Sequence, residues 1–165
     1  MIFRALAVFL CFWGLSSQPL YSQVKGTIVN PAERYPMAIS PLKNLGTGED
    51  GAKLSVGIAD VIIRDLELSG WFRILDRSAY IEDPQKTGIT FGDFDFRDWS
   101  VIGAQALVKG GFHLQGDEIT VELRLFDVYQ ANQMVGKKYT GKVRDFRRIA
   151  HKFADEIIFQ FTGVP

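Results

Sequence analysis

Residues 58–77, IADVIIRDLELSGWFRILDR, constrain the fold of this chain more than any other segment. Apolar side chains recur there at helical spacing, so one face of a helix is apolar. They are Ile58, Val61, Ile62 and Leu66. Gly70 then ends the helix, because glycine adopts the left-handed conformation that closes a helix at no steric cost. Strand-forming residues follow at once at positions 71–75, so the segment predicts a helix packed on a sheet.

The first 22 residues have the pattern of a secretory signal peptide. Arg4 supplies a positive start, residues 5–15 form an unbroken apolar run, and residues 16–22 are small or polar. The run is too short to anchor the chain in a bilayer, so we expect cleavage after Ser22 and an exported product. The single cysteine, Cys11, lies inside this run without a lipidation motif around it. The mature protein is therefore expected to contain no disulfide and no cysteine-based metal site.

The rest of the chain predicts one domain. Lys and Arg number 19 and Asp and Glu also number 19, so the chain lacks the basic surface that nucleic-acid binding requires. No later segment is long and apolar enough to span a membrane. Residues 23–35 are expected to be a mobile N-terminal segment, since they carry no helical period. Residues 36–165 are expected to form the domain, and we expect a monomer.

The periodicity predicts an α/β (α+β) fold: a mixed five-stranded sheet with two main helices packed on it. Strands are expected at residues 37–42, 72–75, 106–114, 119–125 and 134–141. Helices are expected at residues 54–69 and 146–161, with a shorter one at 96–103, and Gly163 is expected to cap the last helix. The first two strands, joined by a helix, should be parallel, and the last three, joined by short turns, antiparallel.

The glycine-rich loop at residues 46–54 lies where a phosphate-binding loop would. A P-loop needs Lys and then Ser or Thr directly after its last glycine. Here Lys53 comes one residue late and Leu54 replaces the hydroxyl. Glu49 and Asp50 would also repel phosphate, and at the start of a helix they instead complement its dipole. We therefore expect a flexible turn with no bound nucleotide.

Other polar residues also favour structural interpretations. Asp93, Asp95 and Asp98 fail the calcium-loop pattern, which requires glycine at its sixth position, and one of them is expected to cap the short helix. His113 and His151 have no second metal ligand at useful spacing.

At a strand end, Asp76 is expected to accept hydrogen bonds from backbone N–H groups, and Arg77 is expected to stay solvated or to pair locally. Phe96 and Trp99 are expected to pack, with Gly103 allowing close approach to the sheet. No nucleophile elbow or carboxylate pair stands out, so we expect neither an enzyme nor a cofactor.

An ordered series of short motifs resembles the amino-terminal domain of the TolB family. The motifs are MAISPL (37–42), IADVI (58–62), DL (65–66), SG (69–70), FRILDR (72–77), FRDW (96–99), GA (103–104), ALV (106–108), Gly110, LRLFDV (123–128), AH (150–151), DEI (155–157) and TG (162–163). They follow one another from residue 36 to 163. The resemblance implies a periplasmic protein of the Tol-Pal system, with two helices on a mixed sheet.

The resemblance also implies partners. Family members link the inner-membrane protein TolA to the outer-membrane lipoprotein Pal, with roles in outer-membrane integrity, cell division and import of colicin-type proteins. The segment expected to engage the C-terminal domain of TolA is Val24, Lys25, Gly26, Thr27, Ile28, Val29 and Asn30. Its imperfect alternation suits β-augmentation. Family members continue after Thr-Gly into a β-propeller that contacts Pal, so a Pal contact is expected only where a propeller is present.

A second interpretation places the chain with the periplasmic domain of a secretion channel of the curli-pore type. That family shares a strand–helix–strand opening that ends in a charged pair with arginine. It requires a lipidated cysteine at the mature N-terminus and amphipathic membrane-spanning hairpins. The sequence has neither feature, so the adaptor interpretation is favoured.

Overall fold

The computed structural model describes residues 34–47 and 51–164. Its strands and helices, in chain order, are β1 (Tyr35–Ile39), β2 (Lys43–Asn44), α1 (Gly51–Ser69), β3 (Phe72–Ile74), α2 (Phe96–Ser100), β4 (Ala106–Gln115), β5 (Glu118–Asp127), β6 (Asn132–Lys142) and α3 (Phe146–Thr162). A short 3-10 turn, η2 (Arg77–Ala79), follows β3 at the start of the loop that leads to α2. A second one, η3 (Val143–Asp145), directly precedes helix α3.

The strands form one mixed six-stranded sheet in the order β3-β1-β4-β5-β6, and the short β2 pairs with β4 beside this path. β1 runs parallel to β3 and to β4, whereas β4, β5 and β6 form an antiparallel meander. The predicted fold class and the predicted strand directions are therefore confirmed. The sheet has one strand more than expected, because β2 lies between the predicted strand at residues 37–42 and the glycine-rich loop at 46–54, where no strand was expected.

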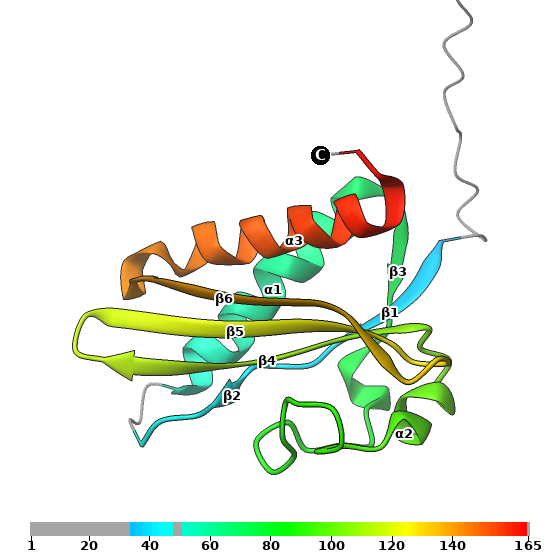
Figure 1. Cartoon of the computed structure of the whole chain (residues 1–165), viewed down its shortest axis with the longest axis horizontal. Helices are drawn as coiled ribbons and strands as arrows, with labels where there is room; N and C mark the ends of the chain where they lie inside the picture. Colours follow the sequence, from blue (N-terminus) through cyan, green and yellow to red (C-terminus); the bar gives the residue numbers. More distant parts are fainter. Residues whose placement is uncertain (1–33, 48–50, 165) are drawn as a thin grey trace, which may run out of the picture.

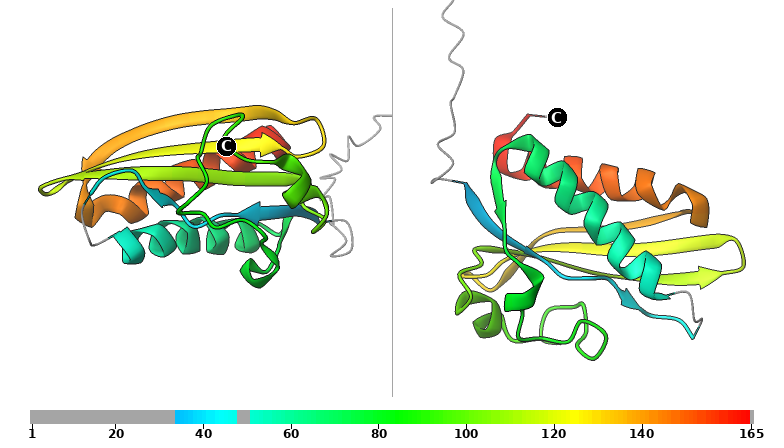
Figure 2. Two further views of the ribbon diagram at one scale, coloured as in Figure 1. Left: turned by 90° about the horizontal axis from the view of Figure 1, so that it is seen from below. Right: turned by 180° about the vertical axis from the view of Figure 1, so that it is seen from behind.

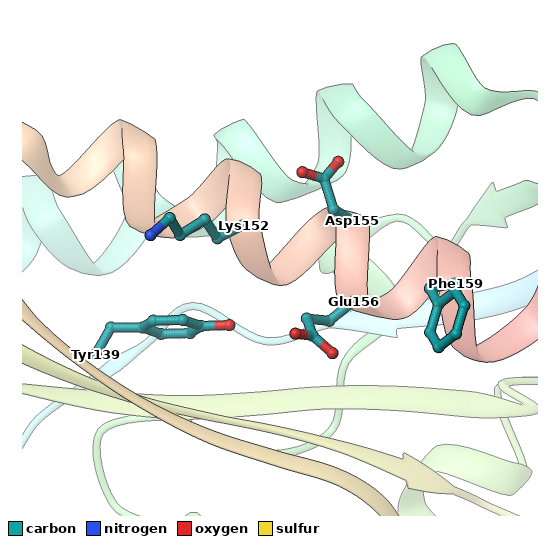
Figure 3. A pocket seen from close by; sticks show the side chains of 5 residues that line it. All are labelled: Tyr139, Lys152, Asp155, Glu156 and Phe159. Atoms are coloured by element: carbon teal, nitrogen blue, oxygen red, sulfur yellow. The ribbon is translucent and has the colours of Figure 1, made fainter. Parts of the chain in front are cut away.

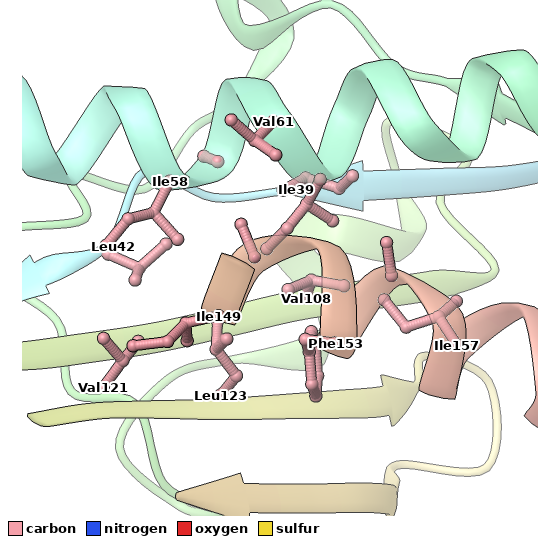
Figure 4. Packing of buried hydrophobic residues seen from close by; sticks show 14 of the residues in the cluster. Ile39, Leu42, Ile58, Val61, Val108, Val121, Leu123, Ile149, Phe153 and Ile157 are labelled. Carbon is pink, nitrogen blue, oxygen red and sulfur yellow. The ribbon is translucent and has the colours of Figure 1, made fainter. Parts of the chain in front are cut away.

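Helices α1 and α3 cover one face of the sheet, and α2 lies with an irregular segment on the opposite face (Figures 1 and 2). The larger core lies between the two long helices and the sheet. Ile58 of α1, Leu123 of β5 and Phe153 of α3 are fully buried in it (Figure 4). Burial of such side chains contributes about 1.5–3 kcal/mol each, so this layer is the main source of stability.

The segment at residues 58–77 has the predicted structure. The apolar face of α1 is buried, and α1 ends at Ser69 as expected. Gly70 has φ +76°, the left-handed conformation that lets the chain turn directly into β3. Gly163 closes α3 in the same way, with φ +69°. Both predicted glycine stops are confirmed.

Two predicted boundaries were wrong at the start of the domain. The first strand was expected at residues 37–42, but β1 begins at Tyr35 and ends at Ile39. Pro41 lies just beyond that end, and proline cannot donate to a ladder. Helix α1 begins at Gly51, earlier than the predicted Leu54.

The second face of the sheet has its own small core, where Phe96 and Trp99 pack as the sequence predicted. Trp99 of α2 is buried there against Phe126 of β5 and Leu107 of β4. Gly103 follows α2 with φ +84°, and no atom lies within 4 Å of the position a Cβ would take. The close-approach explanation for Gly103 was therefore wrong, since its backbone conformation is what requires glycine.

Candidate interaction surface

The residues predicted to bind a partner, Val24 to Asn30, lie outside the residues that the structure describes. The structure does define the start of the folded domain. The described chain begins at Arg34 and continues into β1, an interior strand of the sheet.

The entry point is held by backbone and aromatic contacts. The backbone N–H of Tyr35 donates to the Trp71 carbonyl oxygen at 2.9 Å. The ring of Tyr35 lies 4.7 Å from that of Phe161 near the end of α3, and Phe72 contacts the same ring edge-on at 5.2 Å. Both ends of the described chain therefore meet at one corner of the domain, as Figure 1 shows. A force applied to the chain before residue 34 is therefore transmitted to strand β1, which begins at residue 35.

The polar residues considered as sites from the sequence are engaged within the fold. Asp76 accepts a hydrogen bond from the Ser78 backbone N–H at 2.8 Å, and this bond holds the pKa of the Asp76 carboxyl below its usual value. Arg77 forms an ion pair with Asp60 of α1 at 2.8 Å. The Asp76 contact is the local one that the sequence predicted, whereas the partner of Arg77 lies on helix α1 and is distant in the sequence.

The three aspartates near α2 do not converge. Asp95 caps α2 by accepting from the Arg97 backbone N–H at 2.8 Å, as expected for one of them. Asp93 instead accepts from the Thr90 backbone N–H at 3.0 Å. Within residues 34–47 and 51–164, no group of three or more His, Cys, Asp or Glu side chains is placed to hold a metal ion.

His151 has a partner that the sequence did not indicate. Its Nδ1 lies 2.5 Å from an Asp65 carboxylate oxygen, so α3 and α1 are joined across their exposed sides. The two residues are far apart in the sequence and lie on different helices, so the periodicity of neither helix indicates the contact. His113, in contrast, is exposed on β4, as expected for a surface histidine.

A buried ion pair between Lys109 and Glu82 was missed by the sequence reasoning. The side chain of Lys109 on β4 is 2% exposed, and that of Glu82, in the loop between β3 and α2, is 3% exposed. The Lys109 ammonium contacts the Glu82 carboxylate, the Thr87 hydroxyl at 3.2 Å and the face of the Phe94 ring at 4.5 Å. Burial lowers the pKa of Lys109, and the Glu82 carboxylate opposes that shift. The pair therefore fastens the loop to the sheet.

Further polar contacts hold the same loop. The Tyr80 hydroxyl accepts from the Ile39 backbone N–H at 3.0 Å. The Lys43 ammonium, from β2, donates to the Thr87 carbonyl at 2.9 Å. The Gln85 side-chain amide donates to the Leu42 carbonyl at 3.1 Å. This face of the sheet is thus covered by a segment that lacks regular structure but is tied to three strands.

A groove of about 690 Å³ opens between α3 and the edge strand β6. It is lined by Tyr139 of β6 and by Lys152, Asp155, Glu156 and Phe159 of α3. Figure 3 shows Lys152 above the Tyr139 ring, Glu156 directed toward the strand, and Asp155 directed away from it. Phe159 is 51% exposed, which leaves an apolar wall open to solvent.

Comparison with known proteins identifies the family. The model of the TolB amino-terminal domain matches residues 28–134. The chain belongs to the TolB amino-terminal domain family. The Tol-Pal system protein TolB of Syntrophotalea carbinolica is 43% identical over 110 residues, which cover 67% of this chain and 26% of that protein. TolB of Desulfosudis oleivorans is 37% identical over 139 residues, covering 84% of this chain and 32% of that protein.

The chain spans about a third of the length of the curated TolB relatives that it matches, as in TolB of Geobacter sulfurreducens, where it covers 33%. The family model includes Ile28, Val29 and Asn30 of the predicted binding segment but not residues 24–27.

Solved structures show the same fold. The crystal structure of TolB from Acinetobacter baumannii superposes with a TM-score of 0.61 at 21% identity, over 80% of this chain and 29% of that one. The C-terminal domain of LpoB from Salmonella enterica superposes with a TM-score of 0.53 at 13% identity, over 66% of this chain and 82% of that one. None of the helices in the described residues is both long and apolar enough to cross a membrane.

Proposed function

We propose that this protein is a non-enzymatic adaptor of the Tol-Pal system in the periplasm, and that residues 24–30 engage the C-terminal domain of a TolA-like inner-membrane protein. Its membership of the TolB amino-terminal domain family carries the proposal. In this proposal the protein contributes to the roles of the Tol-Pal system, which are outer-membrane integrity, cell division and import of colicin-type proteins. A Pal contact belongs to a propeller and not to this domain.

The mode of engagement is β-augmentation. Val24 to Asn30 alternate imperfectly between apolar and polar residues, and an extended segment of this kind adds a strand to a partner's sheet through main-chain hydrogen bonds. The segment leads into β1, whose neighbours on both sides hold it in the sheet. Binding at the segment would therefore attach the partner to a rigid body.

The domain boundaries belong to the same proposal. Residues 1–22 act as a cleaved leader, residues 23–35 as the N-terminal segment, and residues 36–165 as the domain. Mass spectrometry of the exported protein is expected to give Gln23 as its first residue. A product that retains residues 1–22 would contradict the leader.

The binding test uses isothermal titration of the purified TolA C-terminal domain into two forms of the protein. The form that begins at Gln23 is expected to bind, and the form that begins at Glu33 is expected to lose binding. Thr27→Pro removes a backbone donor and is expected to weaken binding about tenfold or more. Lys25→Ala, in the same segment, keeps every backbone donor and is expected to weaken binding less. Equal affinity of the two truncation forms would refute the assignment.

A further inference from the structure

The edge strand β6 has an open side. β6 spans 11 residues at one end of the sheet, and among the described residues it pairs only with β5. A long edge presents a row of unpaired backbone N–H and C=O groups, which is a template for another strand. The opposite edge strand, β3, has only three residues, which limits what can pair with it.

The two faces of β6 differ in chemistry. Lys137 and Tyr139 point toward α3, since Lys137 forms an ion pair with Glu156 at 2.8 Å and Tyr139 lines the groove. Lys138 and Lys142 point to the other face, where each pairs with a glutamate of β5, Glu122 and Glu118 respectively.

The charge of the edge selects its occupant. β6 carries three lysines and no acidic residue. An antiparallel pair of two β6 strands in the register that sets Lys138 opposite Lys142 would bring like charges together on both strands, and like charges directly opposite destabilise a sheet. A second copy of this chain is therefore disfavoured, and a strand that carries carboxylates is favoured.

The groove beside the edge suits apolar side chains and one acceptor. The side of α3 from Lys152 to Phe159 is about 10 Å long, which matches roughly three residues of extended chain. Phe159 offers an exposed apolar surface at one end. The Tyr139 hydroxyl is buried and has no hydrogen-bond partner among the described atoms, so it is a donor without an acceptor.

We propose that β6 and the groove under α3 bind an extended segment of a partner protein in which apolar and acidic residues alternate. The segment adds a strand at β6, with its apolar side chains against Tyr139 and Phe159 and its carboxylates beside Lys138 and Lys142. This surface contains none of residues 24–30, so the proposal stands or falls independently of the TolA assignment.

The probe is a capped, fluorescein-labelled peptide of nine residues, Glu-Val-Thr-Val-Glu-Val-Thr-Val-Glu. Its glutamates are four residues apart, as are Lys138 and Lys142. Fluorescence anisotropy with the full exported chain is expected to show saturable binding. N-methylation of one alternate set of peptide amides is expected to abolish binding and that of the other set to leave it, because only one edge of the peptide donates to β6.

Variants locate the site. The double variant Lys138→Glu/Lys142→Glu and the single variant Phe159→Ala are each expected to weaken binding at least about tenfold. Lys86→Glu, which replaces an exposed lysine in the loop between β3 and α2, is expected to leave binding unchanged. Circular dichroism confirms that each variant is folded. Absence of binding, equal loss with Lys86→Glu, or insensitivity to N-methylation would overturn the proposal. So would a dimer in sedimentation velocity that the double variant abolishes, since the edge would then belong to a second copy.

Discussion

Replacing Lys109 with methionine removes the cation that contacts Glu82 inside the fold. Glu82 is 3% exposed and its other contact is a long bond of 3.4 Å from the Trp99 indole N–H. Removing one partner of a buried ion pair leaves an uncompensated charge and costs about 3–5 kcal/mol. For a domain of this size a loss of that order lowers Tm by roughly 10 °C or more. Local opening of the loop sets the upper limit of the loss, since Glu82 then regains water.

Urea unfolding followed by far-UV circular dichroism measures the loss, and tryptophan fluorescence reports whether the loop opens. Trp99 is 1% exposed, so loop opening is expected to shift its emission to the red. Lys86→Met is the matched control: that lysine is 83% exposed and its replacement is expected to change stability by less than about 0.5 kcal/mol.

The double variant Lys109→Met/Glu82→Gln separates the lost pair from the unpaired charge. It is expected to regain most of the stability, because no buried charge is left without a partner. The reasoning is refuted if Lys109→Met unfolds at the same urea concentration as the parent protein, or if the double variant is no more stable than the single one.

Three further outcomes concern the backbone and acid stability. Gly110→Ala is expected to cost about 1–3 kcal/mol in urea unfolding, because its Cβ would lie 2.7 Å from a β5 backbone oxygen; an unchanged midpoint would show that the strands shift freely. Gly163→Ala is expected to cost about 1–2 kcal/mol for a different reason, since space is open there but φ is +69°; a neutral effect would mean that the helix end refolds. Backbone N–H donors hold the pKa values of Asp76, Asp83 and Asp93 below their usual range, so the folded state binds fewer protons than the unfolded state. Stability is therefore expected to fall as pH drops through these lowered pKa values, and Tm that stays flat from pH 7 to 3 would contradict the assignment.

The longer helices and strands were predictable because their apolar patterns repeat over many residues. Helices α1 and α3 repeat apolar residues over several turns, and β5 alternates along its length, so element type and strand direction followed from the pattern. β2 has only two residues and lies in a glycine-rich stretch, which gives no period to detect. Its pairing with β4 depends on a tertiary contact that the local sequence does not encode.

The buried pair was harder to predict for a related reason. Glu82 lies in an irregular segment where a charged residue is ordinarily exposed. Lys109 did carry a signal: it is a single charge in a β4 run that is buried on both faces, and such a lysine requires a partner. Nothing in the sequence indicated which of the carboxylates supplies it. The groove beside β6 likewise depends on how α3 lies over the sheet.

The position of β1 within the sheet has a mechanical consequence. β1 runs between β3 and β4 and parallel to both, so tension that enters at residue 34 along the strand axis loads hydrogen bonds on its two sides together. These include the bond from Tyr35 N–H to Trp71 and the bond from Gln105 N–H to Pro36. Hydrogen bonds that lie across the pulling direction are loaded together, and an interior strand such as β1 has them on two sides whereas an edge strand has them on one. A pull on the preceding residues is thus transmitted to the whole domain before β1 detaches.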